Sequence, residues 1–159
     1  MPDKQANEVL KMALLLERQG KAFYEQVAGQ AASPAVRELF RTLAAEEARH
    51  EEALVERGAG AAGAPGPVPD TLSGLVLSKE IRKQISAAGF EAAAISAAID
   101  MENRAVALYS GRAQETADPE ERVLYQWLTD WERGHQRFLA RIHQELLAEI
   151  WHDSGFWPF

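Results

Sequence analysis

The sequence contains no cysteine. Disulfides, cysteine-ligated zinc or iron and iron–sulfur clusters are therefore excluded, and any bound metal must be held by oxygen and nitrogen atoms. The sequence also has no apolar run of about 18 residues, so it predicts no transmembrane helix. Residues 1–5 are polar and lack the core of a signal peptide, which makes a cytoplasmic location the default expectation.

Basic residues are also fewer than acidic ones. The sequence has 17 Lys and Arg against 24 Asp and Glu, giving a formal net charge of −7. This balance argues against nucleic acid and anionic membranes as partners and mildly favours the capture of cations. No stretch alternates apolar and polar residues as a half-buried strand would, so we expect an all-helical protein. Its 159 residues fit a single domain, 1–159.

Apolar residues at spacings of three and four predict four long helices in two hairpins. We expect hairpin 1 at about 4–57 and hairpin 2 at about 87–149. Ser33-Pro34 and Asp118-Pro119 are each interpreted as an N-cap followed by proline at the first helical position. The stripe predicted for the first helix consists of Val9, Leu10, Met12, Ala13, Leu16, Gly20, Phe23 and Val27.

The segment 58–86 begins with a run of Gly, Ala and Pro that cannot be helical throughout. Antiparallel neighbours need only a few connecting residues, so this length indicates a crossover between two parallel helices. A short helix at about 72–85, with Ser78 as a cap, is expected within it. The tail Trp151 to Phe159 is aromatic; we expect it to be irregular and to pack on the bundle or across a dimer interface, with docking to a partner as the alternative.

One set of residues occurs twice in the chain, and each residue number in the second copy exceeds the first by 85. Glu17, Tyr24, Glu47 and His50 are repeated as Glu102, Tyr109, Glu132 and His135. The prolines that begin the second helix of each hairpin keep the same offset, without an insertion. The sequence therefore indicates the duplication of a helical hairpin.

Spacing within each copy places its acidic and imidazole side chains at one level of the bundle. Glu47 and His50 are three residues apart, so they share one helix face at about 5–6 Å between Cβ atoms. Glu17 and Glu47 each lie about 15 residues from the turn between their helices, which makes them level on antiparallel neighbours. Pairing the two hairpins would bring six metal ligands together: Glu17, Glu47, His50, Glu102, Glu132 and His135.

These residue types suit a site for two metal ions. Carboxylates are hard, anionic and able to bridge two ions, and neutral imidazole completes each coordination sphere. Four carboxylates balance two divalent cations, whereas without metal they would repel one another and some would protonate. We therefore expect a metal-free form that is less stable and sensitive to pH. Tyr24 and Tyr109 each follow a ligand by two helical turns, so each hydroxyl is predicted to reach a carboxylate of the opposite hairpin.

Other polar and aromatic residues near these positions are expected to face elsewhere. Glu46 and Asp130 point about 100° or more away from the ligands, and Glu46 is interpreted as solvated. Asp100 is also expected to be exposed. Trp127 and Trp131 are expected to pack against a neighbour or a dimer partner, with an electron-relay role as the less favoured alternative.

The two Glu-x6-Tyr helices and the two Glu-x-x-His helices resemble the rubrerythrin branch of the ferritin-like superfamily, over roughly residues 5–149. The resemblance implies a ferritin-like four-helix bundle that holds two iron ions, with manganese or zinc as possible substitutes. Rubrerythrins reduce hydrogen peroxide at such a centre, and ferritins oxidise Fe(II) at a similar one. We therefore expect an oxidoreductase that reacts Fe(II) with O2 or hydrogen peroxide, as a cytoplasmic homodimer.

Two departures from the family pattern bear on the reaction. The cysteine-rich rubredoxin domain of the best-known members is missing, so electrons would have to come from an external donor. Peroxidase-type members also tend to carry an extra Glu one turn beyond the third-helix ligand, where this sequence has Ala105, and the equivalent position in the first helix is Gly20. This favours a ferroxidase or simple oxidase. Iron binding, sensing or storage without turnover remains the alternative, followed by a structural bundle that holds zinc.

Overall fold

The computed structural model describes residues 3–62, 66–68, 72, 85 and 89–154, with only the backbone described for 149–154. The helices whose bounds the described residues give are α1 (Lys4–Gln30), α2 (Pro34–Gly58), α4 (Phe90–Glu115) and α5 (Pro119–Ser154). The described residues contain no strand. The prediction of an all-helical protein is confirmed.

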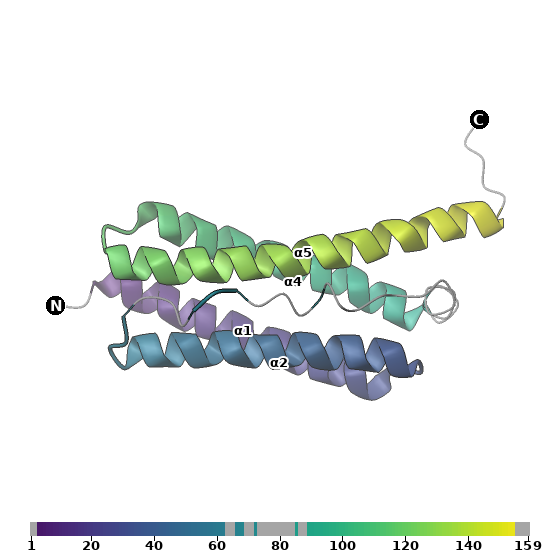
Figure 1. Cartoon of the computed structure of the whole chain (residues 1–159), viewed down its shortest axis with the longest axis horizontal. Coiled ribbons are helices and arrows are strands. Elements are labelled where there is room, and N and C mark those ends of the chain that lie inside the picture. The colour runs from purple at the N-terminus through teal and green to yellow at the C-terminus, as the bar shows by residue number, and fades with distance from the viewer. Residues whose placement is uncertain (1–2, 63–65, 69–71, 73–84, 86–88, 155–159) are drawn as a thin grey trace.

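The helices form a four-helix bundle of the ferritin-like kind (Figure 1). α1 and α2 make one antiparallel hairpin, and α4 and α5 make the other. The end of α1 packs in one apolar cluster with the starts of α2 and α4 and the end of α5. The two helices on either side of the long connection, α2 and α4, are therefore parallel, as the length of the connection predicts.

Helix bounds differ from the predicted ones mainly in the second hairpin. α4 begins at Phe90, directly after Gly89, whose φ of 61° lies in the left-handed region that glycine adopts without strain. α5 runs to Ser154, so its last residues fall in the segment that was expected to be irregular. The predicted helix at about 72–85 with its Ser78 cap, and residues 155–159 of the tail, lie outside the described residues.

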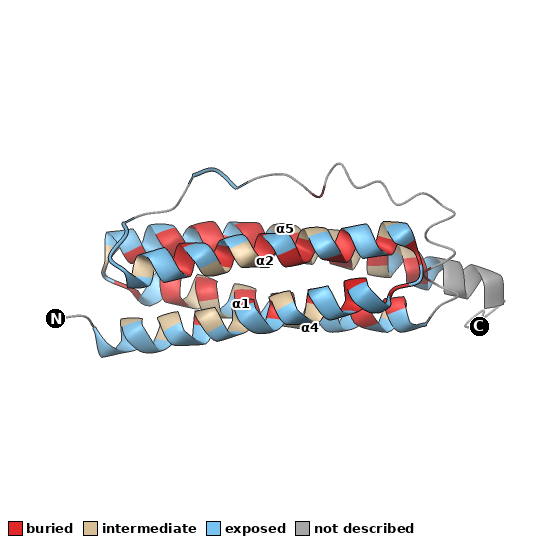
Figure 2. Ribbon diagram, turned by 90° about the horizontal axis from the view of Figure 1, so that it is seen from below, coloured by how far each residue is buried: buried red, intermediate tan, exposed pale blue. Residues whose placement is uncertain are grey.

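Two apolar clusters fill the two ends of the bundle and leave its middle to polar side chains. One includes Val36, Phe40 and Leu139, and the other includes Leu54 and Leu128. Buried residues follow the inward face of each helix (Figure 2). In α1 the predicted apolar stripe is only partly right, because Met12 is 54% exposed while Glu17 and Tyr24 take buried positions. Two polar side chains of α1, those of Glu17 and Tyr24, therefore lie in the interior of the bundle.

The turn of each hairpin is fastened by an arginine at the same place in the two copies. Nε of Arg37 donates to the carbonyl of Ala31 at 2.5 Å, and Arg122 donates to the carbonyl of Thr116, the equivalent residue, at 2.7 Å. The predicted caps differ: Asp118 accepts from the backbone N–H of Glu120 at 3.0 Å, whereas Ser33 makes no side-chain cap hydrogen bond. The two turns therefore share the arginine contact although their N-caps differ.

The two hairpins differ in one buried pair beneath these turns. Hairpin 2 buries an ion pair between Arg112 and Glu121, and Arg112 also reaches Asp3 at 3.5 Å. The equivalent residues of hairpin 1 are Val27 and Val36, both buried. The same position in the fold therefore accepts either an ion pair or an apolar pair.

This exchange predicts how the ion pair contributes to stability. R112V is expected to lower the free energy of unfolding by about 3 kcal/mol, because it leaves a buried carboxylate without its charged partner. The double variant R112V/E121V, which rebuilds the apolar pair of hairpin 1, is expected to lose much less. Denaturant unfolding of both variants and of E121V measures this, and a double variant less stable than either single variant would contradict it.

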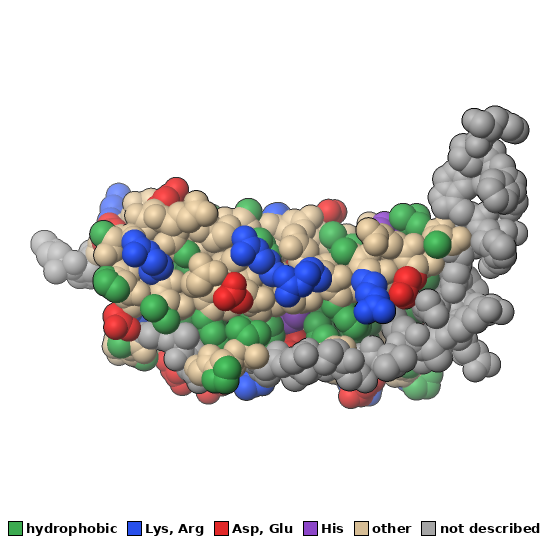
Figure 3. Space-filling view, turned by 45° about the horizontal axis from the view of Figure 1, so that its top comes forward, with side chains coloured by type: hydrophobic (Ala, Val, Ile, Leu, Met, Phe, Trp, Pro, Cys, Tyr) green, Lys and Arg blue, Asp and Glu red, His purple; other side chains and the backbone are tan. Residues whose placement is uncertain are grey.

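The outer surface of the described helices mixes charges of both signs. On the face shown in Figure 3, Lys and Arg side chains are spaced along the length of the bundle, with acidic side chains between them. None of the described helices is both long and apolar enough to span a membrane.

Candidate metal centre

Each of the four helices contributes one glutamate to the middle of the bundle, and α2 and α5 each add a histidine. All six side chains are at most 4% exposed. Their donor atoms form two overlapping groups, each within 4.8 Å. The structure thus brings together all of the residues proposed from the sequence as ligands: Glu17, Glu47, His50, Glu102, Glu132 and His135.

The first group consists of Glu17, Glu47, His50 and Glu132. Nδ1 of His50 lies 3.3 Å from an oxygen of Glu17 and 3.0 Å from an oxygen of Glu132. Glu47, one turn before His50 on α2, lies 3.3 Å from the same nitrogen. The imidazole therefore points Nδ1 at three carboxylates from three helices.

The second group repeats this arrangement around His135. Its Nδ1 lies 3.2 Å from Glu102, 3.1 Å from Glu132 and 3.5 Å from Glu47. Glu47 and Glu132 thus belong to both groups, whereas Glu17 and Glu102 belong to one group each. Because the two shared carboxylates present different oxygens to the two histidines, they are placed to bridge two ions.

Tyrosine hydroxyls hold the two unshared glutamates. Tyr24 donates to Glu102 at 2.5 Å, and Tyr109 donates to Glu17. Each bond joins one hairpin to the other, which is the contact proposed from the two-turn spacing. Burial and nearby carboxylates raise the pKa of both hydroxyls, so they remain protonated donors at neutral pH. The two bonds fix the orientation of the unshared carboxylates.

Because the four glutamates are packed closely together, two of them have lowered pKa values and two have raised ones. Burial would raise the pKa of Glu17, but the charge of His50 and several hydrogen bonds hold it at about 2. The pKa of Glu102 is lowered for the same reasons, with His135 as its partner. Burial and neighbouring carboxylates raise the pKa of Glu47 to about 8 and that of Glu132 well above its ordinary value. Without metal, the bridging pair is therefore protonated at neutral pH.

Both histidines are charged in this metal-free state. Burial would lower their pKa values, but the facing carboxylates, Glu132 and Glu17 for His50 and Glu102 for His135, raise them well above the ordinary value. Two imidazolium ions then balance the two ionised glutamates, Glu17 and Glu102. The six ligand side chains of the metal-free centre therefore carry no net charge, because four of them hold a proton.

The protons held in the centre predict how the stability of the metal-free protein depends on pH. Burial and the neighbouring carboxylates raise the pKa of Glu47 from an ordinary value of 4.5 to about 8 in the folded state. Between these values the folded protein binds more protons than the unfolded chain, so stability falls as pH rises, by about 1.4 kcal/mol per pH unit for each such proton. Thermal unfolding in the presence of a chelator is expected to give a lower Tm at pH 7.5 than at pH 5.5. A constant Tm would contradict the predicted shifts.

Glu46 was expected to be solvated, and this is wrong. Its side chain is 3% exposed, and Oε2 lies 2.6 Å from Nε2 of His135. The residue before a core ligand points about 100° around the helix, which in this bundle is toward α5 and not toward water. One sign of this burial is present in the sequence, since the equivalent residue in hairpin 2 is the aromatic Trp131, which is also buried.

The expectation that Trp127 and Trp131 pack against a neighbour is confirmed, because both lie in an apolar cluster inside the chain, next to His50. The ring of Trp131 lies 4.3 Å from that of His50 and edge-on to it, and Trp127 lies 5.1 Å from Trp131. Asp130 and Asp100 are exposed, as expected. The indoles therefore form part of the wall behind His50.

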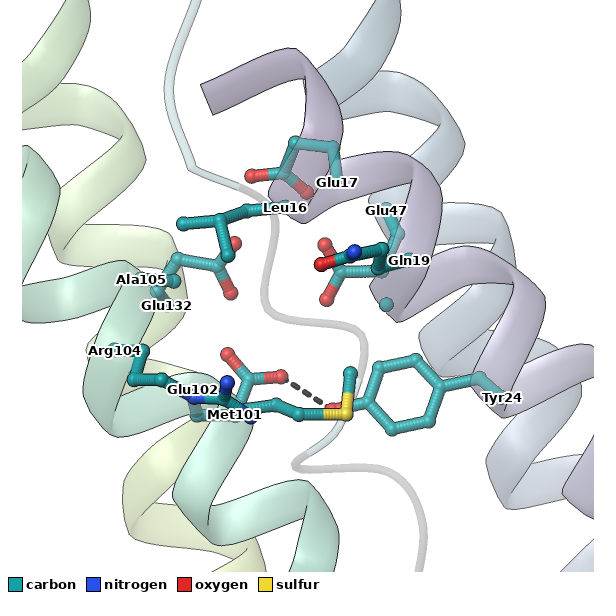
Figure 4. A pocket seen from close by; sticks show the side chains of 11 residues that line it. Leu16, Glu17, Gln19, Tyr24, Glu47, Met101, Glu102, Arg104, Ala105 and Glu132 are labelled. Atoms are coloured by element: carbon teal, nitrogen blue, oxygen red, sulfur yellow. Dashed lines mark hydrogen bonds between the residues drawn. The ribbon is translucent and has the colours of Figure 1, made fainter. Parts of the chain in front are cut away.

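A cavity of about 240 Å³ opens beside the glutamates (Figure 4). Besides the ligands Glu17 and Glu102, its lining includes three pairs of equivalent residues from α1 and α4: Leu16 and Met101, Gln19 and Arg104, and Gly20 and Ala105. A Cβ atom on Gly20 would lie 3.5 Å from the Met101 methyl group and 3.7 Å from the Glu47 carboxyl carbon. The small residues at positions 20 and 105 thus leave free space next to the bridging carboxylates.

The fold and the centre together define a class, the ferritin-like bundles with a buried carboxylate and histidine cluster. The family model for rubrerythrin matches residues 8–143. The chain belongs to the rubrerythrin family. Comparison with curated proteins and with solved structures gives no significant match.

Proposed function

We propose that this protein is a di-iron oxidoreductase that reacts Fe(II) with O2 or hydrogen peroxide, with electrons supplied by an external donor. The observation that carries the proposal is the pair of overlapping ligand groups, which share Glu47 and Glu132. A single-ion site would not need two carboxylates that each face two histidines. The family match supports iron as the metal.

The donor atoms fit a pair of iron ions. Both Nδ1 atoms face carboxylates, and Oε2 of Glu132 is buried without a hydrogen bond, 3.1 Å from Nδ1 of His135. Such an oxygen is costly to bury unless a ligand satisfies it. Glu47 and Glu132 would bridge the ions. Glu17 and His50 would complete the coordination of one ion, and Glu102 and His135 would complete that of the other. Manganese and zinc accept the same donors, and metal analysis distinguishes them.

Bound iron would supply the redox chemistry, and the chain would supply access, orientation and protons. The cavity reaches the bridging carboxylates from the α1 and α4 side, so a small oxidant can approach there. Tyr24 and Tyr109 hold the unshared glutamates in place. Leu16 and Met101 give part of this cavity an apolar lining. Neither Gly20 nor Ala105 adds a fifth carboxylate, which favours ferroxidase or oxidase activity over efficient peroxide reduction.

Metal analysis and oxidation kinetics test the proposal. Protein produced with added iron is expected to hold two iron ions per chain. After anaerobic reduction, O2 or hydrogen peroxide should produce the near-ultraviolet absorbance of ferric carboxylate centres at a rate that stopped-flow mixing can follow. The double variant E47Q/E132Q, compared with wild type for helical content by circular dichroism, is the control. Less than one iron per chain in folded wild-type protein would contradict the proposal.

Filling the cavity is expected to separate metal binding from oxidation. A105L places a larger side chain in the space beside the bridging carboxylates without removing a ligand. The variant should keep two iron ions per chain and react more slowly with O2, because the oxidant has less room beside the ions. Stopped-flow absorbance on the iron-loaded variant measures this. A rate equal to that of wild type would show that the oxidant enters by another route.

Iron binding, sensing or storage without turnover is the second candidate. The same ligand groups support it, since they bind an ion whether or not it reacts. Native mass distinguishes storage, which requires a large hollow assembly, from the homodimer predicted from the sequence. Loss of the ferric signal on adding a reductant, followed by its return with O2 over repeated cycles, would favour turnover.

A further inference from the structure

The two histidines of the centre have different surroundings at the ring nitrogen that faces away from the carboxylates. A histidine that gives Nδ1 to a metal must carry its proton on Nε2, and this N–H needs an acceptor. The two halves of the duplicated chain meet this need differently. The difference lies at one pair of equivalent positions, 46 and 131.

On the His135 side, the acceptor is a buried carboxylate. Oε2 of Glu46 lies 2.6 Å from Nε2 of His135, and both side chains are at most 3% exposed. A carboxylate in this position fixes the ring orientation and makes Nδ1 a stronger donor to a metal. Its negative charge also favours a cation on this side of the centre.

On the His50 side, the equivalent residue is Trp131. An indole N–H is a donor only, so it cannot accept from the imidazole. Nε2 of His50 has no hydrogen-bond partner in the part of the chain that the structure describes, and the ring of Trp131 stands edge-on to it at 4.3 Å between centroids. The Nε2 edge of this imidazole is therefore held by packing and not by a hydrogen bond.

A second charge differs in the same sense. The guanidinium of Arg49 lies 5.3 Å from the ring of Trp131, on the His50 side. The equivalent residue in hairpin 2 is Gly134, which carries no charge. Arg49 is exposed, so solvent screens its effect, but the effect opposes a cation near His50. Arg104, which is exposed and lines the cavity where α1 has Gln19, acts in the opposite sense, so the difference between the two halves rests on Glu46.

We infer that the two metal positions are unequal, and that the position held by Glu102 and His135 fills first because Glu46 supports its histidine. The inference rests on the proposed two-metal function and adds an order of loading to it. Glu46 acts as a positioning residue. It does not belong to either ligand group, and it acts through Nε2 of His135.

Half-loading of wild-type protein tests the order without any substitution. Crystals of metal-free protein supplied with one equivalent of Mn(II) are expected to show most of the anomalous signal near His135 and Glu102. Equal signal at both positions, or most of it near His50, would overturn the inference while leaving the two-metal function in place. Protein that takes up no ion at either position would overturn both.

Variants of Glu46 test the cause. E46L removes the acceptor, and E46Q keeps an acceptor but removes its charge. Titration with Mn(II) or Co(II) is expected to show one of the two binding steps weakened by about 10–100-fold in E46L, with a smaller loss in E46Q and the other step unchanged. The matched control is E52Q, which changes an exposed glutamate on the same helix and should alter neither step.

Two further results decide the role of Glu46. In half-loaded E46L crystals the single ion should no longer prefer the His135 side. In zinc-loaded wild type, the Nε2 proton of His135 should give a strongly downfield NMR signal that is lost in E46L, whereas a merely structural residue would leave this signal in place. If E46L fails to fold, E46Q must still weaken one step selectively. Equal weakening of both steps, or of neither, in the folded variant would overturn the inference.

Discussion

Raising the pH by one unit, between about 6 and 7.5, is expected to increase the affinity of the centre for each of two divalent cations by about 100-fold. The reason is the protonation of the metal-free centre. Glu47, with a pKa of about 8, Glu132 and both histidines all hold a proton in this range. Each of the four groups must lose its proton before it can bind metal. Two ions therefore displace two protons each.

Calorimetry measures this proton release directly. Binding of Mn(II) at one pH, repeated in buffers with different ionisation enthalpies, gives the number of protons released per ion. The control is the same titration near pH 9, where Glu47 is already ionised and fewer protons should leave. Release of less than one proton per ion at pH 6.5 would show that the bridging glutamates and the histidines are not protonated as their surroundings predict.

Loss of a shared glutamate is expected to disturb both ions, whereas loss of an unshared one should disturb a single ion. Glu132 faces both histidines, at 3.0 Å from His50 and 3.1 Å from His135, whereas Glu17 faces only His50. E132Q is therefore expected to weaken the binding of both metal ions by more than about 100-fold. This exceeds the typical loss for a residue that only contacts a metal ligand. E17Q should weaken one step and leave the other nearly intact.

The two substitutions are matched, since each replaces one buried glutamate by its amide. Titration with Co(II), followed by the absorbance of the bound ion, gives the stoichiometry and the two affinities of each variant. Helical content from circular dichroism controls for folding. Two unchanged equivalents in E132Q, or the loss of both in E17Q, would contradict the assignment of bridging and unshared roles.

The fold could be predicted from the sequence because it depends on features that repeat. Pro34 and Pro119, which begin the second helix of each hairpin, are separated by 85 residues, and the glutamates of the two copies have the same separation. The pattern of one hairpin therefore supports the prediction for the other. The crossover between parallel helices followed from its length alone. The six proposed ligands could be predicted for the same reason. A single Glu-x-x-His pair is weak evidence for a metal site, whereas two such pairs, each with a glutamate at the same distance, are strong evidence.

The rest depended on contacts between elements that no local pattern reports. Glu46 was misjudged because helix geometry gives the direction of a side chain but not what lies in that direction. In this case α5 lies there, and the position that was expected to meet water meets His135. Met12 was misjudged for the converse reason, since an apolar residue next to a stripe was counted as part of it although it is 54% exposed.

Duplication within one chain has a consequence for how such a centre can change. If two identical hairpins assembled from separate molecules, a substitution at position 46 would appear on both sides of the centre at once. In the linked chain, Glu46 stands in one half and Trp131 in the other, and Val27 has Arg112 as its counterpart. In a single chain, a substitution therefore changes only one half of the centre. Each half can diverge in this way while the six ligands stay the same in both.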